Sequence, residues 1–373
     1  NTFNFRNPAA NGNFDLTAFS ISATNENNIY KSNYQDINTK KHSSYLSNIS
    51  LAFPITKKLK FGIGYQPYSS KTYDIISTST LSDGTTKANR FKGEGTISTV
   101  QAGVSYKISK EFSLGLRSNF YFGKIFDIEE VSYSNAELIS GYESSNKIKK
   151  YTLTTGATYQ KTLENDRKLT FGATYTFGNM GTSTANYINS TYYYSGIDTK
   201  ANQSIIEERT SNLKNIIPQE FSFGLGYGNE GKWFYSTQLD YKKGEGIEYL
   251  GQPFQYENSY KISAGGWYLP NYNNFRNYFS RVIYRFGAYY EKGNLSVSPL
   301  GSTTKTNVNQ FAVTGGVTLP FANVSVNRIN SVDIGFEVGK RGTLQNNMIS
   351  QTFFNLKLGL NFADKWFQKR QYD

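Results

Sequence analysis

The chain offers few residues for catalytic chemistry. Its 373 residues include a single histidine, His42, and no cysteine. His42 stands beside Ser43 and Ser44 in a polar segment that we expect to be an outer loop, whereas a hydrolase would need this base to meet a nucleophile and an orienting acid. We therefore expect a solvated loop histidine and no enzyme. The lack of cysteine excludes disulfides and thiolate metal sites and suits an oxidising compartment such as the periplasm.

Three Gly-x-Gly pairs resemble fragments of phosphate-binding loops, at residues 62–64, 93–95 and 224–226. None precedes a helical pattern, so the dinucleotide-binding interpretation fails on context. Within strands, glycines on an inner face instead let a wall curve or let a loop approach it closely. The acidic residues are dispersed and lack the spacing of a calcium loop. We therefore expect no cofactor and no metal.

The net charge of +12 raises the question of a nucleic-acid partner. The basic residues are scattered over many short segments, without a recognition helix or an RNP pattern, so we expect no nucleic acid. Attraction to phosphate-rich lipid head groups is a simpler use of the charge. The pairs Lys40-Lys41 and Lys149-Lys150 lie near predicted outer strand ends, where they either contact lipopolysaccharide or are solvated. The expected surroundings are therefore outer-membrane lipid and lipopolysaccharide.

Period-two alternation dominates the elements that would position any site. Aromatic residues make up 16% of the chain, yet the mean hydropathy is -0.54, and no segment approaches the roughly 18 apolar residues of a membrane helix. We count about fourteen alternating segments of roughly 10–16 residues, which exceed the usual soluble strand. That length suits strands that cross a bilayer at a tilt.

The connections alternate in length. They are brief after the second, fourth, sixth and eighth predicted strands (PITKKLK, KISK, LENDR and NEGK), and long and polar after the first, third, fifth and seventh. A two-sheet sandwich also has alternating strands, but it has no reason to sort its loops by length. We therefore predict an all-β transmembrane antiparallel barrel of about 14 strands, with short periplasmic turns and long extracellular loops. Residues 14–362 would form the barrel, 1–13 an N-terminal periplasmic or hatch segment, and 363–373 a periplasmic tail.

The two faces of the strands then have different roles. On the last strand we expect a lipid face made of Phe354, Leu356, Leu358, Leu360 and Phe362. The polar faces would line a lumen, and their charged members are Arg117, Asp240, Lys242, Arg285, Glu291, Asp333, Glu337 and Lys357. Two interpretations stay open: an internal network of salt bridges and hydrogen bonds, or a charged constriction that selects solutes.

A barrel of fourteen strands leaves a lumen that something must block. Residues 1–13 are too few for a full plug by themselves. The segment 178–218 either folds into the mouth or stays an exposed outer loop. Two long periplasmic connections, 269–279 and 320–330, break the short-turn rule, and with the tail they would crowd one side of the rim. Candidate contacts there to an acidic partner or to inner-leaflet head groups are Arg276, Arg281, Lys365, Trp366, Lys369 and Arg370.

Three segments resemble a known family. The stretch FRNPAANG, with Asn7-Pro8-Ala9, resembles the element at which the hatch of FadL-like outer-membrane barrels gives way to the first strand. Residues 265–295 (GGWYLPNYNNFRNYFSRVIYRFGAYYEKGNL) and 333–370 (DIGFEVGKRGTLQNNMISQTFFNLKLGLNFADKWFQKR) resemble segments of the Bacteroidota members. The resemblance implies a fourteen-stranded barrel in the bacterial outer membrane.

The resemblance also implies two alternative functions. FadL-type barrels admit hydrophobic molecules such as long-chain fatty acids through a hatch and an apolar pocket, whereas the inner faces here are polar and charged. Other members serve as membrane subunits of larger machines and transport nothing. Our first hypothesis is therefore a non-enzymatic subunit of a cell-envelope complex, such as barrel-assembly or type IX secretion-like machinery. The alternative is a passive channel for hydrophobic or small polar solutes.

Overall fold

A computed structural model of the chain describes residues 3–33, 37–197, 199–212, 217–229, 231–249, 252–297, 305–325, 328–345 and 348–365. Strands make up nearly all of this structure. The helices within these residues are short 3-10 turns, η1 (Pro8–Asn11), η2 (Glu164–Asp166) and η3 (Tyr278–Arg281). None of the described helices has the length and hydropathy needed to cross a membrane.

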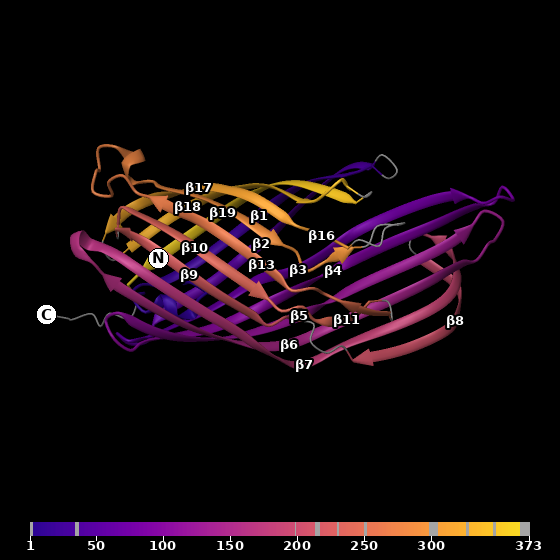
Figure 1. Ribbon diagram of the computed structural model, residues 1–373, viewed down its shortest axis with the longest axis horizontal. Coiled ribbons are helices and arrows are strands. Elements are labelled where there is room, and N and C mark those ends of the chain that lie inside the picture. The colour runs from indigo at the N-terminus through magenta and orange to yellow at the C-terminus, as the bar shows by residue number, and fades with distance from the viewer. Residues whose placement is uncertain are drawn as a thin grey trace.

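Fourteen antiparallel strands close into a barrel (Figure 1). The sheet runs without interruption from β6 through β1 and β19 to β7, and β6 pairs with β7 to complete the circle. The predicted class and strand number are therefore confirmed. The strands of the barrel are β1 (Thr17–Ser32), β2 (Ile37–Pro54), β3 (Leu59–Thr80), β4 (Thr86–Lys107), β5 (Phe112–Tyr133), β6 (Ile139–Thr162), β7 (Arg167–Gly196), β9 (Glu220–Asn229), β10 (Trp233–Lys242), β13 (Ser259–Tyr268), β14 (Ile283–Lys292), β17 (Gln310–Ser325), β18 (Arg328–Gly342) and β19 (Ile349–Asp364).

One end of the barrel carries the tight turns, and we call it the turn end. The backbone of Ile55 bonds to Leu59 across the first of these turns, and Ile108 bonds to Phe112 across the second. The four brief connections predicted from the sequence all lie at this end, at the left of Figure 1. The opposite end, which we call the outer end, carries the extensions of β3–β7.

The outer connections are shorter than the sequence suggested. Strand β3 runs on to Thr80, β5 runs to Tyr133, and β7 continues to Gly196 before it returns as β8 (Thr199–Asn212). The segment 178–218 is therefore mainly a hairpin rather than an irregular loop. Polar and apolar residues mix on both faces of these extensions, so the period-two signal fades, yet β-branched residues and Tyr favour strands and the backbone ladder persists.

The long connection predicted at 320–330 is wrong. Strand β17 continues to Ser325 and β18 begins at Arg328, and these two residues pair with each other in the antiparallel ladder. The connection at 269–279 does remain outside the sheet, and it includes part of η3 before β14 begins. We call residues 269–282 the rim loop. It stands out from the turn end of the barrel (Figure 1).

The wall has one short seam. Strands β2 and β3 pair only from Ile49↔Tyr65 to Pro54↔Lys60, whereas β3 and β4 pair up to Thr80↔Thr86. Strands β3–β8 thereby form a tall sheet that continues beyond the closed part of the barrel (Figure 1). Two small hairpins complete the outer end, β11 (Gly246–Tyr249) with β12 (Gln252–Gln255) and β15 (Ser296–Val297) with β16 (Thr306–Asn307).

Candidate functional site: the lumen and the rim

The N-terminal segment lies inside the turn end of the barrel. Phe3 and Phe14 are buried in a cluster with three alanines, Ala18, Ala52 and Ala363, from β1, β2 and β19. The ring of Phe3 contacts Phe14 edge-on at 6.1 Å. The segment therefore fills part of the lumen and packs against several strands at once.

Glycines on the inner face of the wall make room for this segment. A methyl group added to Gly62 would lie 2.7 Å from the ring of Phe3, and one added to Gly115 would lie 2.4 Å from the backbone of Pro8 and Ala9. Real Cβ atoms do not approach so closely. These glycines therefore serve the close approach of a loop, as the sequence suggested, because any larger residue would displace the segment.

Polar contacts hold the same segment in place. Asn7 caps η1 by accepting a bond from the backbone N–H of Ala9 at 3.0 Å, and its Nδ2 donates to the carbonyl of Ala157 at 3.1 Å. Proline follows at the first position of the turn, where its missing N–H costs nothing. The Asn-Pro-Ala sequence thus both starts η1 and fastens it to β6.

An ion pair adds to these ties. The ammonium of Lys60 on β3, whose side chain is 1% exposed, lies 2.8 Å from Asp15, just before β1. Neither this pair nor the full extent of the docking was predicted from the sequence. A usable signal existed, because glycines recur at inner-face positions of neighbouring strands, at residues 62, 64, 103, 115, 156 and 172.

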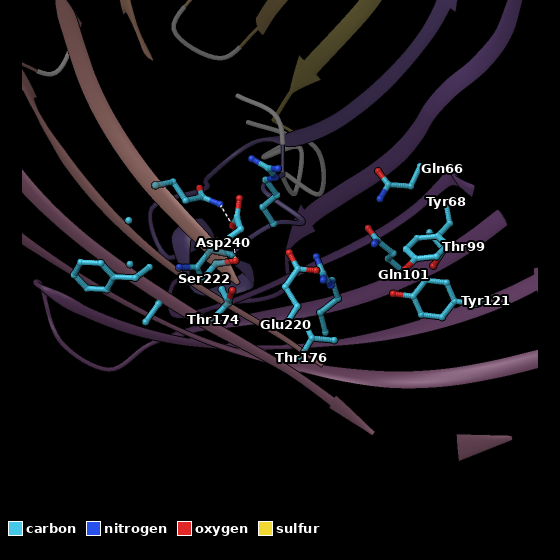
Figure 2. A pocket seen from close by; sticks show the side chains of 18 residues that line it. Gln66, Tyr68, Thr99, Gln101, Tyr121, Thr174, Thr176, Glu220, Ser222 and Asp240 are labelled. Carbon is cyan, nitrogen blue, oxygen red and sulfur yellow. Dashed lines mark hydrogen bonds between the residues drawn. The ribbon is translucent and has the colours of Figure 1, made fainter. Parts of the chain in front are cut away.

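A polar cavity of about 210 Å³ lies against this segment (Figure 2). Two of the predicted lumen charges, Arg117 and Asp240, line it together. Asp240 accepts a hydrogen bond from Ser222 at 2.6 Å, and Arg117 donates to Thr154 at 3.0 Å. The other polar residues of its lining include Arg6, Asn7, Gln66, Tyr68, Thr99, Gln101, Tyr121, Thr174, Thr176, Glu220 and Gln238.

The remaining predicted lumen charges lie on the last strands and their neighbours. Arg285 lies 3.6 Å from Asp333, which also accepts from Asn361 at 2.8 Å. Glu337 accepts hydrogen bonds from Tyr289 and Asn355. By register, the other three face polar or small partners: Lys242 faces Glu220, Glu291 faces Lys261, and Lys357 faces Gly335. The contacts of Asp333 and Glu337 join β14, β18 and β19 by polar side chains.

A larger cavity of about 930 Å³ lies nearer the outer end. Its lining comes from both sides of the short seam, with His42 on β2 and Tyr68 on β3, and Tyr68 also lines the smaller cavity. His42 lies within a strand and not in the predicted loop, and its Nδ1 contacts Asn27 at 2.7 Å. The described residues contain no cluster of side chains suited to a metal ion.

The last strand presents its large apolar residues on the outward face. Phe354, Leu356, Leu358, Leu360 and Phe362 are all exposed. They alternate with the inward-facing Lys357 and with Asn361, which bonds to Asp333. In this structure the outward face of β19 is apolar and its inward face is polar.

The rim loop exposes two aromatic rings. Phe275 is 71% exposed and Phe279 is 70% exposed. The guanidinium of Arg281 lies 4.9 Å from the ring of Phe275, and Tyr278 donates to the carbonyl of Pro320 on β17 at 3.0 Å. The loop is thus anchored to the barrel while its two phenylalanines stay uncovered.

The other predicted partner contacts have different placements. Arg276 is exposed on the rim loop, and Lys365 is exposed at the end of β19. Trp366, Lys369 and Arg370 lie outside the described residues.

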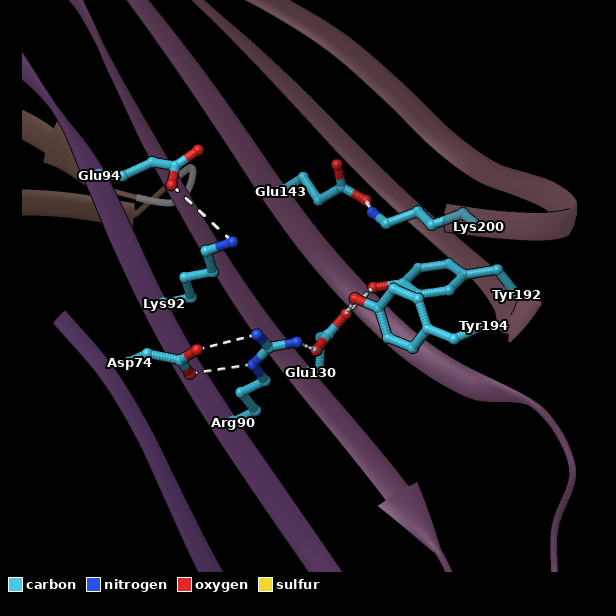
Figure 3. A network of polar contacts seen from close by, with 9 residues as sticks. All are labelled: Asp74, Arg90, Lys92, Glu94, Glu130, Glu143, Tyr192, Tyr194 and Lys200. Carbon is cyan, nitrogen blue, oxygen red and sulfur yellow. Dashed lines mark hydrogen bonds and ion pairs between the residues drawn. The ribbon is translucent and has the colours of Figure 1, made fainter. Parts of the chain in front are cut away.

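The outer part of the tall sheet contains a polar network (Figure 3). Arg90 on β4 lies 2.8 Å from Asp74 and 3.4 Å from Glu130, and Glu130 accepts hydrogen bonds from Tyr192 and Tyr194. Burial and the bond to Glu130 raise the pKa of Tyr194 to about 12. The bond to Arg90 lowers the pKa of Asp74. Tyr194 therefore stays protonated and Asp74 stays ionised over the neutral range, and the network ties β7 to β3.

The Glu130→Ala variant should loosen the outer hairpin without unfolding the barrel. The change leaves the hydroxyls of Tyr192 and Tyr194 without their acceptor and removes one of the two carboxylate partners of Arg90, at a cost of about 1–3 kcal/mol. Amide exchange in β8 and the outer half of β7 should accelerate by roughly 5- to 150-fold, as mass spectrometry can measure. Glu94→Ala is the control, because Glu94 is exposed and its ion pair with Lys92 is long, at 3.8 Å. Equal effects of both variants would contradict the role given to Glu130.

The closed fourteen-stranded sheet, with a chain segment docked inside, has the fold of FadL-like outer-membrane barrels. The chain is similar in fold to a FadL homologue from Pseudomonas aeruginosa, with a TM-score of 0.65, 13% identity, and coverage of 97% of this chain and 93% of that one. It is also similar to the toluene transporter TodX of P. putida (TM-score 0.56, 13% identity, 97% and 93%) and to the CymD monoaromatic hydrocarbon channel (TM-score 0.59, 13%, 97% and 92%).

The sequence itself identifies the family. Residues 1–373 match the BamG family, and the chain belongs to it. No curated protein matches the sequence.

Proposed function

We propose that the chain resides in the bacterial outer membrane and acts as a non-enzymatic membrane subunit of a cell-envelope complex of the barrel-assembly kind. The observation that carries this proposal is the rim loop, whose Phe275 and Phe279 are uncovered at the turn end. Large exposed aromatic residues beside arginine are the usual anchors of protein interfaces. Membership of the BamG family supports the same function, since the family's name refers to barrel assembly.

The occupied lumen favours the function of a membrane subunit over that of a passive channel. The N-terminal segment fills the turn end, and the cavity beside it measures only about 210 Å³. Its lining includes Arg117, Glu220 and Asp240, so it suits neither a fatty acid nor an aromatic hydrocarbon. In this proposal the barrel is a membrane anchor, and the rim loop presents the contact to a periplasmic partner.

The double variant Phe275→Ser/Phe279→Ser should lose the partner. The protein is extracted in mild detergent with a tag, and co-purifying proteins are identified and quantified. We expect stoichiometric recovery of a partner with the wild-type chain and a loss of affinity of roughly 30-fold for each ring removed, because central aromatic anchors each contribute about 2 kcal/mol. Ile76→Ser/Ile206→Ser is the control, because it removes two exposed apolar side chains at the outer end.

A second function, a passive channel, is favoured by one observation. The two cavities share Tyr68, and the larger one borders the short seam between β2 and β3. A solute that displaced the N-terminal segment would therefore find a continuous polar path. Recovery of the barrel alone, with measurable flux of small solutes into liposomes, would support the channel and overturn the subunit proposal.

A further inference from the structure

Three lysines gather on one face of two neighbouring strands of the tall sheet. Lys124 on β5 is the direct cross-strand partner of Lys147 on β6, and Lys149 lies two residues along β6 on the same face. All three are exposed, whereas Ile148 and Lys150, which alternate with them, are buried. The three lysines therefore project from the outward face of the barrel wall.

Nothing in the described part of the chain neutralises these charges. Like charges directly opposite each other destabilise a sheet. None of the three forms an ion pair with a described residue, and their neighbours in register on β4 and β7 are Thr96, Thr182 and Thr184. The acid nearest in register is Glu94, two residues from Thr96, and it pairs with Lys92 at 3.8 Å. The cluster is thus a site of positive charge that lacks an anion.

The height of the cluster on the wall indicates what that anion is. Immediately below it lie stacked rings: Phe120 is 5.5 Å from Phe122 and 4.6 Å from Tyr151. The outward residues from Phe112 to Phe122 are mostly apolar, and at about 3.3 Å per residue and a tilt of about 40° they rise roughly 25 Å, the height of the apolar band of an outer-membrane barrel. The lysines therefore lie at the depth of the outer head groups.

We infer that Lys124, Lys147 and Lys149 bind the phosphate groups of an outer-leaflet glycolipid of the lipid A class. Ammonium groups form short, charge-assisted hydrogen bonds to phosphate, and the rings below offer a surface for the acyl chains and sugars at the interface. Lys150 takes no part, because it points inward and donates to the carbonyls of Asn179 and Gly181. The inference rests on the outer-membrane placement proposed above and is independent of any protein partner.

Binding of purified lipid A to the detergent-solubilised chain tests the site, with native mass spectrometry as the readout. The variant K124Q/K147Q/K149Q should bind lipid A on the order of 100-fold more weakly, because each basic residue near an anionic surface contributes about 1 kcal/mol, or fivefold. The matched control, K57Q/K58Q/K110Q, removes three exposed lysines from the turn end and should bind as the wild type does. Replacing the three outer lysines by arginine should preserve binding.

Other outcomes would overturn the inference. These are equal weakening by both triple variants, no weakening by K124Q/K147Q/K149Q, or equal binding of dephosphorylated lipid A to the wild type. Displacement of lipid A by excess inorganic phosphate would assign the site to free phosphate instead of a lipid. The co-purification experiment tests the rim loop and not the three lysines, so a failure to recover a protein partner would not affect the lipid A result.

Discussion

A chain that begins at Phe14 should conduct ions where the longer chain does not. Residues 3–13 occupy the lumen at the turn end, with Phe3 and Ala9 buried against the wall. A fourteen-stranded barrel without this segment is wide enough for water and ions. We expect single-channel conductance in planar bilayers to rise by about tenfold or more, since open, water-filled pores conduct without a desolvation barrier.

The outer end supplies the control for this experiment. Shortening the hairpin of β7 and β8 removes residues that lie beyond the closed part of the barrel, so it should leave the conductance low. If removal of residues 1–13 left the conductance unchanged, the N-terminal segment would not be the barrier, and the polar contacts of Arg117 and Asp240 deeper in the lumen would have to close it.

The second large effect should follow from a single substitution, Gly115→Leu. Even a Cβ atom at position 115 would lie 2.4 Å from the backbone of Pro8 and Ala9. The larger leucine side chain would take the place of this backbone, so the N-terminal segment must leave the wall. Gly335→Leu is the matched control, because the nearest atoms to a Cβ there lie 3.8 and 3.9 Å away. We expect Gly115→Leu to raise the conductance as far as the deletion does and Gly335→Leu to leave it low.

Thiol labelling independently tests whether Gly115→Leu releases the N-terminal segment from the wall. The chain has no cysteine, so Ala9→Cys introduces a single reactive group at a position that is 1% exposed. In the otherwise unchanged chain it should react slowly with a maleimide, and together with Gly115→Leu it should react roughly 100-fold faster, because the segment is then open to solvent. Equal labelling rates would show that the segment tolerates the leucine in place.

The barrel could be predicted because contact with lipid imposes a period-two pattern that is visible in the sequence. An outward face in contact with lipid must be apolar over its whole height, so residues such as Leu356 and Leu358 alternate strictly with polar ones. Where the strands of the tall sheet leave that constraint, polar and apolar residues mix on both faces and the alternation no longer marks the element. The lower halves of β3, β5 and β7 were therefore predicted from their alternation, and the outer ends, which lack it, were not.

The contacts inside the lumen depend on register, which a sequence does not display. Asp15 and Lys60 lie 45 positions apart, and neither segment has a sequence pattern that predicts contact with the other. The adjacent lysines 149 and 150 looked like one basic pair, but a strand sends them to opposite faces. The role of a glycine is especially hard to predict from sequence. The need for glycine at position 115 follows from the backbone of Pro8 and Ala9, which packs against it.

The short seam gives the wall a point of mechanical weakness. Strands β1 and β19 pair continuously from Thr17↔Asp364 to Ser32↔Ile349, whereas β2 and β3 share only the stretch from Ile49 to Pro54. The N-terminal segment bridges this stretch from within, through Phe3 against Ala52 and Gly62 and through Asp15 on Lys60. Docking of the segment and closure of the seam are thus reciprocally linked. A force that draws the N-terminal segment out of the turn end therefore loosens the wall at the seam, and opening of the seam releases the segment.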